Sequence, residues 1–219
     1  MSADTTGFWT PVALSADLPP GTVIPARTRA GSIALWRSDS GRVAASADRC
    51  PHRGMRLSYG FVRGEALSCI YHGWSYTQTG NCLRIPAHPG LTPPDTIRVA
   101  THLVEEADGL IWVAVGEPVH PPPKLEGLVA LRSLTMHADV ATIEAALGAK
   151  SNETGLLKAT RQFEPMWLLL SEQEQGHTLA HVLLEGDSTL GDRISASRAV
   201  ESLRRCAEDL QARRRSRDG

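Results

Sequence analysis

The chain has 219 residues, a net charge of −1 at pH 7, 42% hydrophobic residues and four cysteines. This length allows one large or two small domains, and the near-neutral charge argues against nucleic acid as a partner. A polar start and the lack of a long apolar run argue against a signal peptide or a membrane span, and four cysteines are too few for a disulfide framework, so we expect a cytoplasmic protein.

The first 46 residues alternate between short apolar runs and turn residues. Strands are expected at residues 8–14, 22–26, 32–37 and 43–46, with turns at residues 18–21 and 38–41. Short strands separated by frequent turns are typical of a small antiparallel sandwich or barrel.

Residues 50–76 contain two short blocks that offer metal ligands, sixteen residues apart. The first is Cys50-Pro-His52-Arg53-Gly54, and the second is Cys69-Ile-Tyr71-His72-Gly73-Trp74. Two thiolates and two imidazoles suit either a tetrahedral zinc or a [2Fe–2S] cluster with one iron held by histidines. The glycine in each block favours the cluster, because a tight turn there can offer backbone N–H groups to sulfur. Residues 56–62 and 66–69 are expected to form a strand pair turned at Arg63-Gly64, where a zinc finger would continue into a helix.

The two blocks resemble the signature of Rieske non-haem iron oxygenases of the ring-hydroxylating type. The resemblance runs from about residue 8 to 118 and includes Trp9, Gly80, Pro86 and the segments 109–112 and 116–118. It implies a Rieske-type [2Fe–2S] cluster with Cys50 and Cys69 on one iron and His52 and His72 on the other. It also implies that Arg53, Gly54, Tyr71, Gly73 and Trp74 surround these ligands, and that a proline loop at residues 86–90 lies over the cluster.

The same resemblance predicts a low reduction potential. High-potential respiratory Rieske proteins carry an additional cysteine in each block and a serine that hydrogen-bonds to a bridging sulfide. Met55, Tyr71 and Trp74 occupy these places here. Because fewer hydrogen bonds to sulfur stabilise the reduced state less, we expect the midpoint reduction potential of the cluster to lie below 0 mV, at about −150 mV.

After the second block, strands are expected at residues 74–77 and 82–85, followed by a hairpin of 97–105 and 110–115 turned at 107–109. Residues 118–123 are proline-rich and should form a stiff linker. In the second half we expect strands at 130–136, 162–171 and 177–184, a helix at 139–147 stopped by Gly148, and a helix at 197–211. The basic tail at 213–217 is expected to be a solvated, disordered end, and Cys82 and Cys206 to be small buried apolar residues.

The predicted fold class is therefore α+β, mainly β. A Rieske-type antiparallel β-sandwich at 1–118 is followed by a linker at 119–126 and by a small, reduced oxygenase-like α+β region at 127–219.

A mononuclear iron in this chain is not expected. The oxygenase family binds that iron through two histidines and a carboxylate, and the closely spaced histidine pair is missing after residues 135–144. The alternative ligands are His177, His181 and Glu185, which would share one face of a strand.

Three functional hypotheses remain open. The chain is an electron-transfer subunit of an oxygenase, with the catalytic iron on a partner subunit; a free-standing Rieske ferredoxin; or a complete oxygenase with an atypical iron site. Each needs a reductase or ferredoxin as electron donor, and the first also predicts assembly with a catalytic subunit or with further copies of the chain. About a hundred residues beyond the Rieske-like half, and a length below that of most such oxygenases, favour the first hypothesis.

Overall fold

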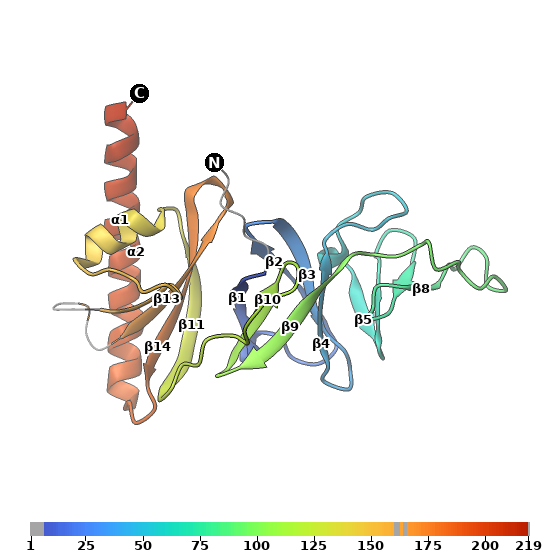
Figure 1. Ribbon diagram of the computed structural model, residues 1–219, viewed down its shortest axis with the longest axis horizontal. Coiled ribbons are helices and arrows are strands. Elements are labelled where there is room, and N and C mark those ends of the chain that lie inside the picture. Colours follow the sequence, from blue (N-terminus) through green and yellow to red (C-terminus); the bar gives the residue numbers. More distant parts are fainter. Residues whose placement is uncertain (1–6, 160–162, 164–165, 219) are drawn as a thin grey trace. The chain divides into compact units, whose positions relative to one another are not determined.

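The computed structural model describes residues 7–159, 163 and 166–218, which group into two compact units (Figure 1). The first unit comprises the chain up to residue 106 and residues 111–122. The second comprises residues 123–219 and the hairpin tip at 107–110. The predicted polar start at residues 1–6 and part of the predicted strand at 162–171 lie outside the described residues.

The first unit contains two antiparallel sheets. The larger has the strand order β1-β10-β9-β4-β3-β2, and the smaller the order β5-β6-β7-β8. The strands are β1 (Trp9–Leu14), β2 (Thr22–Thr28), β3 (Gly31–Arg37), β4 (Val43–Ala47), β5 (Phe61–Arg63), β6 (Ala66–Ser68), β7 (Ser75–Tyr76), β8 (Cys82–Arg84), β9 (Thr101–Ala107) and β10 (Leu110–Ala114), with short 3₁₀ turns η1 (Ser15–Asp17) and η2 (Leu57–Tyr59).

Strand β3 is buried on both faces, which explains its continuous apolar run. Because side chains alternate along a strand, Ile33 and Leu35 enter one core while Ala34 and Trp36 enter another. The second core also contains Cys50 and Cys69, so the hydrophobic interior of the unit holds the bases of the two ligand blocks.

The strand predicted at residues 56–62 is only partly formed. Residues Leu57–Tyr59 form the 3₁₀ turn η2 because the buried Asp48 carboxylate accepts hydrogen bonds from the Ser58 amide at 2.7 Å and from its hydroxyl at 2.8 Å. This local side-chain cap competes with strand pairing. The hairpin that follows pairs Arg63 with Ala66, so its turn lies at Gly64-Glu65, one residue later than predicted.

The second unit is a four-stranded antiparallel sheet, ordered β11-β14-β13-β12, with both helices packed on one face (Figure 1). Its elements are β11 (Leu128–Met136), α1 (Val140–Leu147), β12 (Leu156–Lys158), β13 (Trp167–Gln173), η4 (Glu174–Gly176), β14 (His177–Glu185) and α2 (Leu190–Asp218). The prediction of a mainly β chain with antiparallel sheets and a small α+β second region is confirmed.

Helix α1 begins and ends as its sequence predicts. The Asp139 carboxylate accepts a hydrogen bond from the Thr142 amide at 2.7 Å, and Gly148 ends the helix with a left-handed φ of 67°. Ile143 and Leu147 enter the core between the helices and the sheet.

Helix α2 is longer than predicted, and two sequence-based predictions about it are wrong. It begins where Thr189 and Asp192 cap each other and continues to Asp218, so residues 213–217 are helical and not a disordered tail. Arg214 binds the Thr142 hydroxyl of α1 at 2.9 Å, which gives this end of the helix a partner. Cys206 is exposed because the buried face of α2 runs through Val200, Leu203 and Ala207. Among the described residues, no helix is long and apolar enough to cross a membrane.

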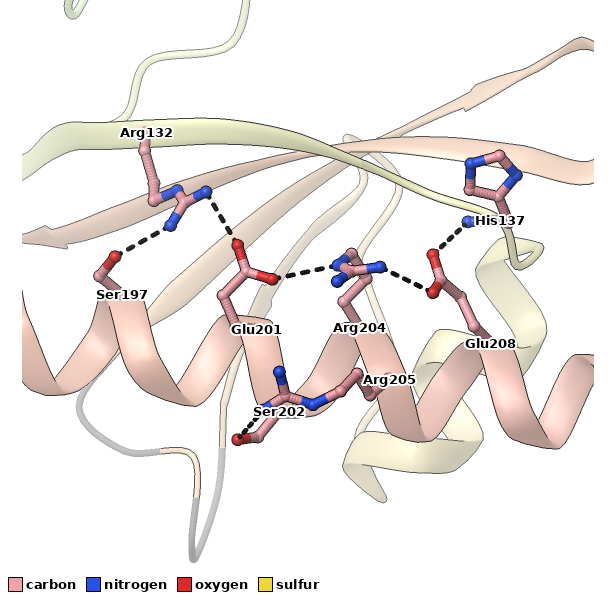
Figure 2. Close-up of polar contacts among 8 residues, drawn as sticks. All are labelled: Arg132, His137, Ser197, Glu201, Ser202, Arg204, Arg205 and Glu208. Carbon is pink, nitrogen blue, oxygen red and sulfur yellow. Dashed lines mark hydrogen bonds and ion pairs between the residues drawn. The ribbon is translucent and has the colours of Figure 1, made fainter.

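A chain of charged contacts ties α2 to β11 (Figure 2). Arg132 of β11 donates to Glu201 at 3.0 Å, and Arg204 links Glu201 to Glu208 through bonds of 3.1 and 2.8 Å. Glu208 in turn accepts the backbone N–H of His137 at 3.0 Å. The contacts join one helix face to one strand and so fix how α2 lies along the sheet.

Candidate metal centre

The two ligand blocks fold into loops with the same backbone pattern. In the first, the Cys50 amide donates to the Met55 carbonyl and the Gly54 amide donates to the Cys50 carbonyl, both at 2.8 Å. In the second, the Cys69 amide donates to the Trp74 carbonyl at 2.8 Å and the Gly73 amide to the Cys69 carbonyl at 3.0 Å. The glycines have left-handed φ values of 72° and 70°, which explains why both blocks carry glycine four residues after cysteine.

These loops bring the four candidate ligands together in two pairs. Cys50 and Cys69 are 2% exposed, whereas His52 and His72 are exposed, with ring centroids 4.8 Å apart. Desolvation raises the pKa of the Cys69 thiol, although amides of Tyr71 and His72 hydrogen-bond to its sulfur, and neighbouring Cys50 adds to the rise. A bound cation would reverse this effect, since coordination deprotonates a thiol.

The pKa of His52 is lowered, first by partial desolvation and then by neighbouring His72 and Arg53. A lowered pKa keeps the imidazole neutral, and a neutral imidazole is the form that binds a metal. The two thiols are therefore buried and the two imidazoles are exposed, so the two pairs present different chemistry.

Aromatic side chains pack against both histidines. The half-buried Trp74 indole stacks on the His52 ring with a centroid distance of 4.4 Å, and the exposed Tyr71 ring lies 3.9 Å from that of His72. Gly73 lies against Pro86, where an added Cβ would be 3.0 Å from the proline Cγ. The proline loop predicted near the cluster therefore touches the second block. Arg53 is exposed beside His52.

Tyr76 also belongs to the site, and the sequence analysis missed it. Its hydroxyl lies 3.1 Å from the Cys50 sulfur, its side chain is 2% exposed, and burial raises its pKa, so the phenol stays protonated and can donate a hydrogen bond to a thiolate at Cys50. Its place directly after the second block was visible in the sequence, but there it was interpreted only as part of a strand. Cys82 is buried in the same core, as predicted.

Residues 8–101 match the family model of the Rieske [2Fe–2S] domain. These residues form a Rieske [2Fe–2S] domain. The prediction of a Rieske-type [2Fe–2S] domain is therefore confirmed for this part of the chain.

Curated relatives agree with this assignment over about half of the chain. Over 115 residues the chain is 45% identical to the oxidoreductase NdmD of Pseudomonas putida, covering 52% of this chain and 20% of that protein. A 4beta-methylsterol monooxygenase of Methylococcus capsulatus is 39% identical over 129 residues, covering 55% of this chain and 35% of that protein. The chain thus spans about a fifth to a third of the length of these relatives.

Solved structures resemble the fold of nearly the whole chain. Apo dicamba monooxygenase has a TM-score of 0.73 at 20% identity, with 97% of this chain and 88% of that chain covered. The QL mutant of NdmA from Pseudomonas putida CBB5 with caffeine has a TM-score of 0.69 at 16% identity, with 90% of this chain and 79% of that chain covered. At this identity the likeness concerns the fold alone.

The alternative iron ligands on β14 are spread along the strand. His177 and Glu185 are the first and last residues of β14, about 26 Å apart at 3.3 Å per residue, too far to share one metal ion. Each has its own contact: His177 with the His137 ring at 4.4 Å, buried His181 with the Ser133 hydroxyl at 2.7 Å, and Glu185 with Lys158 at 3.6 Å. Within the described part of the chain, no three His, Cys, Asp or Glu side chains are grouped around a single ion position. A [2Fe–2S] cluster does not require such a group, because it takes two protein ligands on each iron.

Proposed function

We propose that the chain is the Rieske electron-transfer component of an oxygenase system. In this proposal Cys50 and Cys69 hold one iron of a [2Fe–2S] cluster, and His52 and His72 hold the other. Bound in this way, the cluster supplies one-electron transfer at a potential within about −150 to +300 mV. It would take electrons from a reductase or ferredoxin and pass them to a non-haem iron site on a partner subunit.

The observation that carries the proposal is the difference in exposure between the two ligand pairs. Buried sulfur ligands and exposed imidazoles 4.8 Å apart give the site one side that faces solvent. Electron transfer needs a short distance, so a partner should approach that side. The donor set fits a Rieske cluster because both loops present one thiol and one imidazole from the same backbone turn.

The surrounding residues would orient and shield the ligands. Trp74 and Tyr71 limit the movement of the two imidazoles, and the Tyr76 hydroxyl donates a hydrogen bond toward Cys50. Gly54 and Gly73 permit the turns, and Arg53 places a positive charge beside His52. Mutating residues that hold the orientation of metal ligands typically costs about 10- to 100-fold in metal affinity or activity.

The fold likeness of the whole chain to oxygenases supports an oxygenase component over a free-standing ferredoxin. We therefore propose a Rieske domain at 1–118, a proline-rich linker at 119–126 and an oxygenase-like region at 127–219. The first unit ends at Pro122, within that linker. We also propose a cytoplasmic location, where the thiols would remain reduced.

The experiment is to measure iron and sulfide per chain on anaerobically purified protein, together with the electron spin resonance spectrum of the reduced form. The proposal predicts two irons, two sulfides and a rhombic signal that Cys69→Ser removes. Turnover with a reductase should require an added iron-binding subunit. A third iron, with activity of the chain alone that His177→Ala abolishes, would favour the complete oxygenase; stoichiometric zinc in colourless protein would refute the cluster.

A further inference from the structure

The segment that surrounds the candidate cluster has a charge opposite to that of the rest of the chain. Residues 48–98 contain six arginines, no lysine and three acidic residues, a net charge of +3, whereas the whole chain carries −1. The remaining residues therefore carry −4. Such a separation creates a local positive potential within an otherwise acidic molecule.

Two of the three acidic residues of this segment are already engaged. The Asp48 carboxylate is buried and accepts two hydrogen bonds from Ser58. Glu65 forms an ion pair with Arg42 at 2.7 Å, and that hydrogen-bonded contact lowers the pKa of Glu65 to about 2. Only Asp95 is left to offset the exposed arginines.

Three exposed arginines lie beside the ligand loops, and we call them the arginine rim: Arg49, Arg53 and Arg84. Arg53 follows His52 directly in the first loop and is exposed. The Arg49 guanidinium lies against the first loop, 3.4 Å from the position of a Cβ on Gly54. Arg84 pairs across strands with Ser75, three residues after His72.

Exposed apolar side chains lie beside the same histidine tips. Ile70 is 59% exposed, and Tyr71 is 53% exposed while its ring packs against His72. A small apolar centre with charged residues around it is the common arrangement of protein interfaces, and aromatic residues and arginines are enriched there.

We infer that this face is the docking site of an electron-donor protein with an acidic surface. The inference rests on the proposed function and adds the chemistry of the partner. Acidic side chains of the donor meet the arginine rim, while its apolar contact covers Ile70 and Tyr71 next to the histidines. Charge complementarity of this kind accelerates encounter and is weakened by salt.

The test measures the second-order rate at which a pre-reduced, acidic plant-type [2Fe–2S] ferredoxin reduces the holoprotein, from low to high NaCl. The wild-type rate should fall by about tenfold or more with added salt. Arg84→Glu should slow reduction by about 3- to 10-fold at low salt. Arg84→Gln should act in the same direction with a smaller effect.

The matched control is Arg198→Glu, which makes the same charge change on the exposed face of α2. It should alter the rate by less than about twofold, because it leaves the arginine rim unchanged. Dithionite should reduce the wild type, Arg84→Glu and Arg198→Glu at equal rates. A normal cluster spectrum with a salt-independent reduction rate would overturn this inference but leave the proposed function intact. Equal effects of the Arg84 and Arg198 substitutions on that rate would do the same. A chain that binds no cluster would refute the proposed function and this inference together.

Discussion

The Trp74 indole lies parallel to the His52 imidazole, with 2° between the ring planes and 4.4 Å between their centroids. The indole covers one face of a proposed iron ligand and limits both its rotation and its contact with water. A stacked aromatic pair contributes about 0.5–1.5 kcal/mol beyond burial. The relationship joins two loops that are distant in sequence, because His52 belongs to the first block and Trp74 to the second.

Replacing Trp74 should make the bound cluster less durable. We expect Trp74→Ala to shorten the half-life of the visible absorption in air by about 2- to 10-fold, the change that corresponds to losing the stacking energy. Trp74→Phe should retain most of the wild-type half-life because a ring still covers His52. Tyr59→Ala is the control: it removes an exposed aromatic ring that lies beside Arg56, and the half-life should not change. Equal half-lives for Trp74→Ala and the wild type would show that the indole does not protect the site.

Tyr76 should raise the reduction potential through its hydroxyl. A hydrogen bond to sulfur stabilises the more negative, reduced state, and one bond contributes about 1 kcal/mol, or roughly 40 mV for one electron. We therefore expect a wild-type midpoint potential below 0 mV, at about −150 mV, and a further decrease of tens of millivolts in Tyr76→Phe. Redox titration followed by electron spin resonance measures both values. An unchanged midpoint in Tyr76→Phe would mean that this 3.1 Å contact does not tune the cluster.

The Rieske half could be predicted closely because its information is local. In each block, cysteine, histidine and glycine occur close together in the sequence, and they form one backbone loop that carries one thiol and one imidazole. The contribution of Tyr76 could not be predicted in this way. It depends on β7 carrying the phenol back toward Cys50, a contact between residues 26 positions apart. Likewise η2 replaces a predicted strand because Asp48, ten residues earlier, caps it.

The second unit was predicted less completely because more of its structure depends on contacts between residues far apart in the sequence. Its two helices were found from apolar spacing and from caps such as Asp139 and Gly148. The end of α2 was missed because its arginine-rich sequence lacks an apolar stripe; there Arg214 binds Thr142, 72 residues away. The short strand β12 has three residues, too few for a periodic pattern, and it forms by pairing with β13.

Gly73 should not tolerate a side chain. Its φ of 70° disfavours residues with a Cβ by roughly 1–2 kcal/mol, and that Cβ would lie 3.0 Å from Pro86 Cγ. We expect Gly73→Ala to lower the thermal midpoint of the holoprotein by roughly 2–8 °C and to reduce iron per chain. Gly90→Ala is the matched control, since Gly90 has no left-handed φ and no described atom lies within 4 Å of its added Cβ. Equal midpoints for the two variants would show that the second loop can adopt another conformation.

Glu144 should make the second unit sensitive to acid. Hydrogen bonds from Lys150 and then Ser151 lower the pKa of Glu144 to about 2, from a reference value of 4.5. A folded-state pKa below the unfolded value gives stability that is present above about pH 4.5 and is lost as the pH falls toward 2. Glu144→Gln should therefore lower the thermal midpoint at pH 7 by about 2–4 °C. The expected decrease is small because solvent screens the charge of the exposed Lys150.

The difference in thermal midpoint between Glu144→Gln and the wild type should narrow as the pH is lowered from 5 to 3. Glu153→Gln, at an exposed position in the following loop, is the control, and its thermal midpoint should match that of the wild type at every pH from 7 to 3. A difference between Glu144→Gln and the wild type that is constant across this pH range would exclude the ionised carboxylate as the source of the stability.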